Sequence, residues 1–134
     1  MNTGNAVIVV ALLLAQLEHP EPIFPNPDNF AHVDSCPLVL RVSSKSRYVS
    51  YENSSSSSVV AIRFGCVRKS ESAFRVVSEY DAYKLAHILK PGWSTTFTAE
   101  DLNSKVTLCL KGDSRLAIVF VGFSDGGAWQ ISRP

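Results

Sequence analysis

The chain has 134 residues, of which 46% are hydrophobic and 19% are charged. This size and composition fit one globular domain that buries about two-thirds of its unfolded surface, and they exclude general disorder. The formal net charge of +1 excludes the strongly basic surface typical of nucleic-acid-binding domains, so we expect no nucleic-acid partner.

The N-terminal segment contains ten consecutive apolar residues, 6–15. A helix needs about 20 such residues to cross a bilayer, so we expect no stable membrane span. The run has the length of the apolar region of a secretory signal peptide, although no Lys or Arg precedes it. We therefore predict that residues 1–16 are either a signal peptide or an apolar segment packed on the domain, and that the protein is secreted or periplasmic.

Residues 17–37 are rich in proline, which fixes φ and removes backbone donors, and this predicts an extended linker or an arm strapped onto the domain. The prolines are Pro20, Pro22, Pro25, Pro27 and Pro37. His19 and His32 lie in the same segment near acidic residues, but no pair has the spacing of a defined metal site. We expect no metal and no cofactor.

Residues 38–134 alternate short apolar runs with polar turns, which is typical of an all-β domain. The expected strands are 38–42, 47–52, 58–67, 74–77, 93–98, 106–110, 115–123 and 128–131. Residues 80–89 fit a strand and a helical stripe equally well, and we predict a strand there. Thr98 can cap a single helical turn that ends at Leu102. The spacing predicts an antiparallel immunoglobulin-like β-sandwich of about seven to nine short strands.

The longest apolar run of this domain is Arg115–Phe123, and it is predicted to be a central strand. On a strand, one face carries Leu116, Ile118 and Phe120, and the other carries Ala117, Val119, Val121 and Phe123. Because both faces are apolar, we expect one to meet the opposing sheet and the other to be covered by loops or a neighbouring segment. Asp125-Gly126 then predicts a hairpin turn of type I′, in which both central residues have positive φ.

Three cysteines, Cys36, Cys66 and Cys109, are present. Cys66 and Cys109 both lie in predicted strands, so in an exported protein they are the natural disulfide pair, and Cys36 is left over. On a strand, however, Cys109 faces away from its apolar neighbours Val106, Leu108 and Leu110. The alternative is that Cys66 and Cys109 are small buried hydrophobic residues.

Aromatic side chains are the candidate ligand-binding residues. Trp93 and Trp129 each lie beside a turn, and together with Tyr83 they could stack on sugars or anchor a protein partner, whereas core packing is the alternative for each. His87 is the only histidine after residue 37, and an arrangement of Cys66, His87 and an Asp would suit nucleophilic catalysis. A structural role for His87 is more usual, and no Gly-x-Ser-x-Gly motif occurs, so we predict that the protein is not an enzyme.

Four segments carry a resemblance to a known group of proteins: 53–55, 59–67, 89–92 and 117–129, the last of which ends in Val121-Gly-Phe-Ser-Asp-Gly-Gly-Ala-Trp129. Over about residues 38–131, the chain resembles small exported bacterial immunoglobulin-like β-sandwich proteins of uncharacterised function. The resemblance implies an exported sandwich and brings no catalytic residues with it.

Three functional hypotheses follow from these features. The leading one is a non-enzymatic module that binds a protein or a cell-envelope component through a loop end or an edge strand, since edge strands offer unpaired amides. The alternative is a carbohydrate-binding module, which requires at least two coplanar exposed rings. A small hydrolase or thiol enzyme is a further alternative, which requires His87 within hydrogen-bond reach of a nucleophile.

Overall fold

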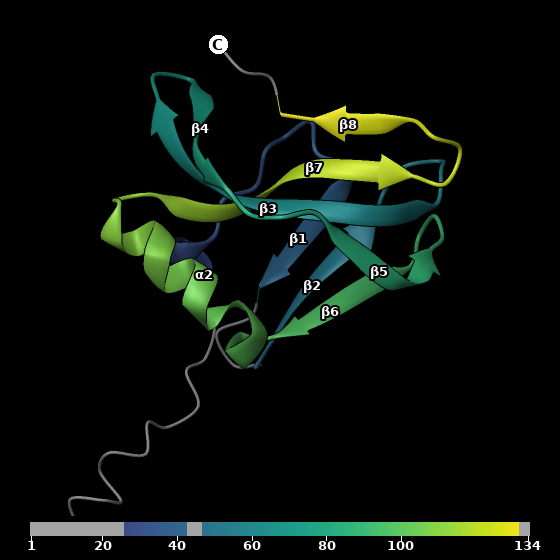
Figure 1. The fold of residues 1–134 in the computed structure, drawn as a ribbon, viewed down its shortest axis with the longest axis horizontal. Coiled ribbons are helices and arrows are strands. Elements are labelled where there is room, and N and C mark those ends of the chain that lie inside the picture. The colour runs from purple at the N-terminus through teal and green to yellow at the C-terminus, as the bar shows by residue number, and fades with distance from the viewer. Residues whose placement is uncertain (1–25, 43–46, 132–134) are drawn as a thin grey trace, which may run out of the picture.

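The computed structural model describes residues 26–42 and 47–131 (Figure 1). The predictions made for residues 1–16 and for the first part of the proline-rich segment lie outside these ranges. Within them, the chain is mostly antiparallel β-structure in two sheets, as the sequence predicts.

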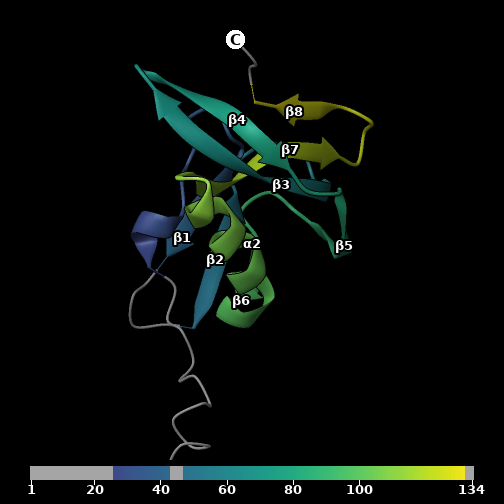
Figure 2. The same cartoon turned by 60° about the vertical axis from the view of Figure 1, so that its left-hand side comes forward.

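The first sheet has three strands, β1 (Leu38–Val42), β2 (Tyr48–Asn53) and β6 (Ser94–Thr98), in the order β1-β2-β6. The second sheet has the order β4-β3-β7-β8, with β5 also paired to β3. Its strands are β3 (Val59–Ser70), β4 (Ala73–Glu79), β5 (Tyr83–Leu89), β7 (Arg115–Phe123) and β8 (Ala128–Gln130). A short 3-10 helix, η1 (Pro27–Asn29), precedes the sheets, and helix α2 (Ala99–Lys111) connects β6 to β7. Figure 2 shows the two sheets one above the other, with α2 beside them.

The main core lies between the two sheets and under α2, and it takes buried side chains from β1, β2, β3, β5, β6, α2 and β7. Tyr51, Phe64 and Phe97 meet in it in edge-to-face contacts, with ring centroids 5.5 to 6.1 Å apart. A second, smaller cluster lies on the other face of the five-stranded sheet and contains Ala31, Val67, Ala117, Val119 and Ile131. Strand β7 contributes to both clusters, so both of its faces are buried, as expected of a central strand.

The predicted division of β7 into two faces is wrong beyond Val119. Arg63 of β3 lies opposite Phe120, whereas the next residue, Phe64, lies opposite Ile118, so Val119 is an extra residue in a β-bulge. A one-residue slip exchanges the two faces. Val121 therefore joins Leu116 and Ile118 in the main core, and Phe120 turns to the other side, where the Arg63 guanidinium lies 5.4 Å from its ring centroid.

The described part of the proline-rich segment, residues 26–37, packs against the domain as an arm. The backbone N–H of Ala31 donates to the carbonyl of Leu116 at 2.9 Å, and Phe30 forms a parallel bridge to the same residue. Phe30, Ala31 and Cys36 are buried. The arm therefore lies alongside β7 and contributes to both faces of the sheet: Phe30 and Cys36 join the main core, and Ala31 joins the second cluster.

The predicted strand 106–110 is wrong, because these residues belong to α2, which is also longer than the single turn expected at Thr98. A capping box begins the helix: the Thr98 hydroxyl accepts from the backbone N–H of Asp101, and the Asp101 carboxylate accepts from that of Thr98. Leu102, Val106 and Cys109 form the buried stripe at helical spacing, while Leu108 is 57% exposed. The alternating apolar residues that suggested a strand are thus divided between the two sides of a helix.

The β7–β8 hairpin closes where predicted, but its turn is not of type I′. Among the residues of this turn, Gly126 has a positive φ of 91° and Asp125 does not. The Asp125 carboxylate accepts from the backbone N–H of Gly127 at 2.8 Å, and the N–H of Phe123 donates to the carbonyl of Gly127. A type I′ turn needs two residues with positive φ, whereas this turn has positive φ at Gly126 but not at Asp125. The hydrogen bond from the Gly127 N–H to the Asp125 side chain helps to form the turn instead.

Candidate functional site

The structure joins Cys66 and Cys109 in a disulfide, with their Cα atoms 5.3 Å apart. On the predicted strand, Cys109 would have faced away from its apolar neighbours, but residues 106–110 form part of a helix. Residues three apart on a helix share a face, so Cys109 points inward with Val106. The bond ties α2 to β3, and it occupies the sulfur that the Cys66 and His87 arrangement needs as a thiolate. His87 itself is exposed on β5.

The three aromatic candidates lie at separate places. Tyr83 begins β5, Trp93 lies in the turn that follows β5, and Trp129 lies on β8 at the far edge of the sheet. Trp93 is 55% exposed, and the Lys90 ammonium lies 5.0 Å from its ring centroid. Trp129 is half-buried against both clusters, and its indole N–H donates to the Ser35 hydroxyl at 3.3 Å. Among the described residues, the rings in contact have interplanar angles of 63° to 80°, so none of these pairs is coplanar.

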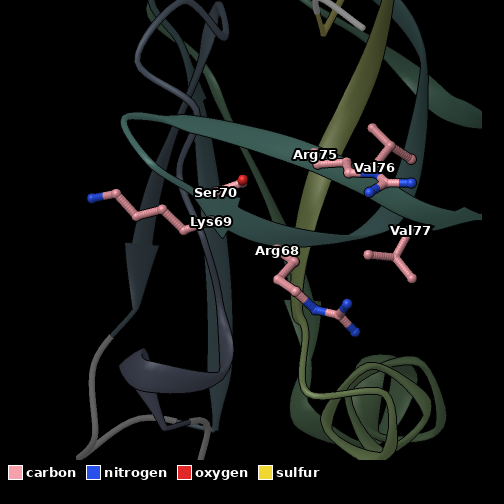
Figure 3. Close-up of a pocket in the computed structure, with 6 residues that line it drawn as sticks. All are labelled: Arg68, Lys69, Ser70, Arg75, Val76 and Val77. Carbon is pink, nitrogen blue, oxygen red and sulfur yellow. The ribbon is translucent and has the colours of Figure 1, made fainter. Parts of the chain in front are cut away.

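The hairpin of β3 and β4 forms a basic surface that the sequence did not single out. A cavity of about 290 Å³ at this hairpin is lined by Arg68, Lys69, Ser70, Arg75, Val76 and Val77 (Figure 3). Arg68 and Arg75 are direct cross-strand partners, an arrangement of like charges that is unfavourable by itself. Arg68 is held by the end of α2, since its guanidinium donates to the carbonyls of Gly112 and Asp113. Figure 3 shows Arg68 pointing from β3 towards that helix.

Arg75 and Lys69 carry the remaining positive charge of this hairpin. Both are exposed, and neither has an ion pair or a side-chain hydrogen bond with another described residue. Val77 beside them is 46% exposed. The hairpin therefore presents two cations and an apolar side chain to solvent, together with the exposed carboxylate of Glu71 in its turn.

Strand β4 is also the terminal strand of its sheet. Ser70 and Ala73 close a two-residue turn, and the closing pair of such a hairpin exchanges both backbone hydrogen bonds. Antiparallel alternation then turns the N–H and C=O groups of Phe74 and Val76 away from β3. In residues 26–42 and 47–131, no strand pairs with this outer edge. The hairpin turn lies at the outside of the fold in both views (Figures 1 and 2).

Sequence reasoning found the strand at 74–77 but not that it is an edge. Local pattern predicts that a strand exists, whereas its place in the sheet depends on long-range pairing. One feature of the sequence does indicate an edge position, because edge strands often carry charged side chains. Positive charges lie on both sides of the turn, with Arg68 and Lys69 before it and Arg75 after it.

Two observations on the described residues concern metal-ligating side chains and the free thiol. No group of three His, Cys, Asp or Glu residues in it could hold a metal ion. Cys36 is a free buried cysteine, and burial raises the pKa of its thiol to about 11, so the thiolate form is scarce at neutral pH. No helix in the same ranges is long and apolar enough to cross a membrane.

Comparison with protein-family models, with curated proteins and with solved structures gives no match for this chain.

Proposed function

We propose that this protein is a non-enzymatic, exported binding module whose β4 edge accepts an extended segment of a partner protein, such as a protein of the cell envelope. The observation that carries this proposal is the position of β4 at the end of its sheet, with no strand among the described residues on its outer side. Strand addition gains affinity from main-chain hydrogen bonds and specificity from neighbouring side chains. Phe74 and Val76 supply the outward backbone groups, and the basic hairpin supplies the side chains.

The charge of the hairpin indicates the chemistry of the partner. An added strand would run beside Arg75, whereas Lys69 lies on β3 and its side chain points away from Arg75 (Figure 3). Acidic side chains in the partner segment would meet the positive charge of Arg75, and Val77 would offer an apolar contact. The same charge opposes pairing between two copies of β4, because each copy would bring its own Arg75 to the shared edge. The partner is therefore a different chain.

Export and the finer fold class belong to the same proposal. A disulfide persists in an oxidising compartment, so the Cys66–Cys109 bond favours secretion or a periplasmic location. Two antiparallel sheets around one core favour an immunoglobulin-like β-sandwich. In this chain, however, the disulfide joins a helix to a sheet instead of linking two sheets.

The test uses a photo-crosslinking amino acid in place of Val77, introduced into the full chain in its native host. The matched control carries the same amino acid in place of Leu108, which is exposed on α2 and is not part of the β4 edge. We expect a partner adduct from position 77 and none from position 108. Val76→Pro removes a backbone N–H that points away from β3 and leaves the hydrogen bonds between β4 and β3 in place. It should weaken partner binding by about tenfold or more, whereas Val76→Ala keeps the N–H and should not weaken binding.

The circular dichroism spectrum and the intact disulfide establish that each variant is folded. Adducts of equal yield from positions 77 and 108 would contradict the proposal. So would an adduct at position 77 that survives Val76→Pro unchanged, because contact would then not depend on the backbone of the edge.

A further inference from the structure

A second cavity of about 530 Å³ lies between the β4–β5 connection, β6 and the first turns of α2. Its apolar lining includes the buried rings of Phe64 and Phe97, which meet edge-to-face at 5.5 Å. Tyr83, 49% exposed, packs against Phe97 with ring centroids 6.0 Å apart and an interplanar angle of 69°. One aromatic ring is thus held against the cavity by the core while much of its surface stays open to solvent.

Charged groups also line this cavity. Asp81 comes from the β4–β5 connection, and Asp101 comes from the first turn of α2. Lys105 is the third charged residue, and its ammonium lies 5.4 Å from the ring centroid of Tyr80. The Tyr80 hydroxyl donates to the backbone carbonyl of Lys105 at 3.2 Å, which fixes that ring beneath the ammonium. The lining thus contains two carboxylates and one ammonium, so its formal charge is negative, and the Asp101 carboxylate also accepts a hydrogen bond from the backbone N–H of Thr98.

We propose that this cavity binds an arginine side chain of a partner peptide, with its aliphatic part and guanidinium plane against Tyr83 and its charge directed to Asp81 and Asp101. The inference goes beyond strand addition at β4 and does not depend on it. A guanidinium group stacks on aromatic rings and forms planar hydrogen bonds to carboxylates, which a compact ammonium does less well. The Lys105 ammonium over Tyr80 is an internal example of a cation on a ring of this cavity.

Other ligand classes fit the lining less well. An anion would be repelled by the two carboxylates, and an apolar side chain would take water away from them without giving a hydrogen bond in return. A sugar stacks best on a flat aromatic face, whereas the rings here meet at steep angles. Charge complementarity therefore favours a cation carried on an aliphatic chain.

The test is a titration of the isotope-labelled full chain with N-acetylarginine methylamide, followed by amide chemical shifts. The citrulline analogue, which has the same shape without the charge, is the ligand control, and the lysine analogue tests the preference for guanidinium. We expect saturable shifts at Tyr83, Phe97 and Lys105 with the arginine compound, weaker ones with lysine, and none with citrulline.

Three variants locate the interaction. Asp81→Asn should weaken arginine binding by about threefold or more, since it removes one carboxylate from a partly exposed site. Lys105→Met keeps the packing on Tyr80 but removes the competing ammonium, so it should strengthen binding by a similar factor. Asp34→Asn makes the same charge change as Asp81→Asn on the exposed arm and should have no effect.

Equal binding of the citrulline or lysine compound would overturn the assignment. Equal effects of Asp81→Asn and Asp34→Asn would overturn it as well, because only the net charge would then matter. The absence of saturable shifts up to about 50 mM arginine compound would rule out a specific site. A dispersed amide spectrum is the control that each variant is folded, and it separates a loss of arginine binding from a loss of structure.

Discussion

The disulfide between Cys66 and Cys109 is expected to supply a large share of the stability of this domain. The two residues are 43 apart in sequence, and the entropy of closing a loop of that length corresponds to about 4 kcal/mol at about 25 °C. Domains of ordinary stability unfold at a total cost of about 5–15 kcal/mol. Reduction is therefore expected to lower the free energy of unfolding by about 4 kcal/mol, and to loosen α2 in particular, because the bond ties this helix to β3.

Urea unfolding of the oxidised chain and of the reduced chain measures this difference. Because both sulfurs are buried, the chain is reduced while unfolded and then refolded in a phosphine reductant. Cys36→Ala is the control and should show the same loss on reduction, since Cys36 is not in the bond. Amide exchange should accelerate more in α2 than in β2. A reduced chain within about 1 kcal/mol of the oxidised one would refute the loop-entropy argument.

Three further substitutions test local features by their effect on urea unfolding. Gly65→Ala would bring a Cβ atom 2.9 Å from the Ser78 carbonyl oxygen and 3.0 Å from Val119, so we expect a loss of about 1–3 kcal/mol; unchanged stability would contradict this close approach. Glu71→Gly should stabilise the chain by about 0.5–1 kcal/mol because Glu71 has a φ of 56° in the hairpin turn, and a loss would show that the left-handed conformation is not strained. Tyr51→Phe should be neutral or stabilising by about 1 kcal/mol, because the buried Tyr51 hydroxyl has no hydrogen-bond partner among the described residues; a clear loss would show that the hydroxyl is bonded.

Much of the fold could be predicted from sequence because strands have local signals. The apolar runs that became β3 and β7 are long. The Pro-Gly pair in Lys90-Pro-Gly92 is a local turn signal, and the turn there has Gly92 at a φ of 81° and the N–H of Trp93 donating to the carbonyl of Lys90. The helix α2 was missed although its capping box and buried stripe are both readable at helical spacing. The alternation of Val106, Leu108 and Leu110 competed with that signal, and only the burial pattern separates the two interpretations.

The candidate sites were harder to predict from the sequence than the strands were. The bulge at Val119 reverses the faces of β7, and nothing in an apolar run marks where an extra residue will be inserted. Likewise, Tyr83 was a candidate for its residue type alone. Phe97 contacts it from β6, and Lys105 lines the same cavity from α2, through packing that the sequence pattern does not specify. Edge position and cavity lining both depend on tertiary structure, so the two proposed binding surfaces could be identified only from the fold.

The free edge of β4 is tested most directly by residue-resolved hydrogen exchange of the isolated protein. We expect the amides of Phe74 and Val76 to exchange at nearly the rate of an unfolded chain, while the amide of Arg75, which points towards β3, is protected. Protection of Phe74 and Val76 equal to that of Arg75 in the monomer would show that the edge is already covered, and would contradict strand addition at β4.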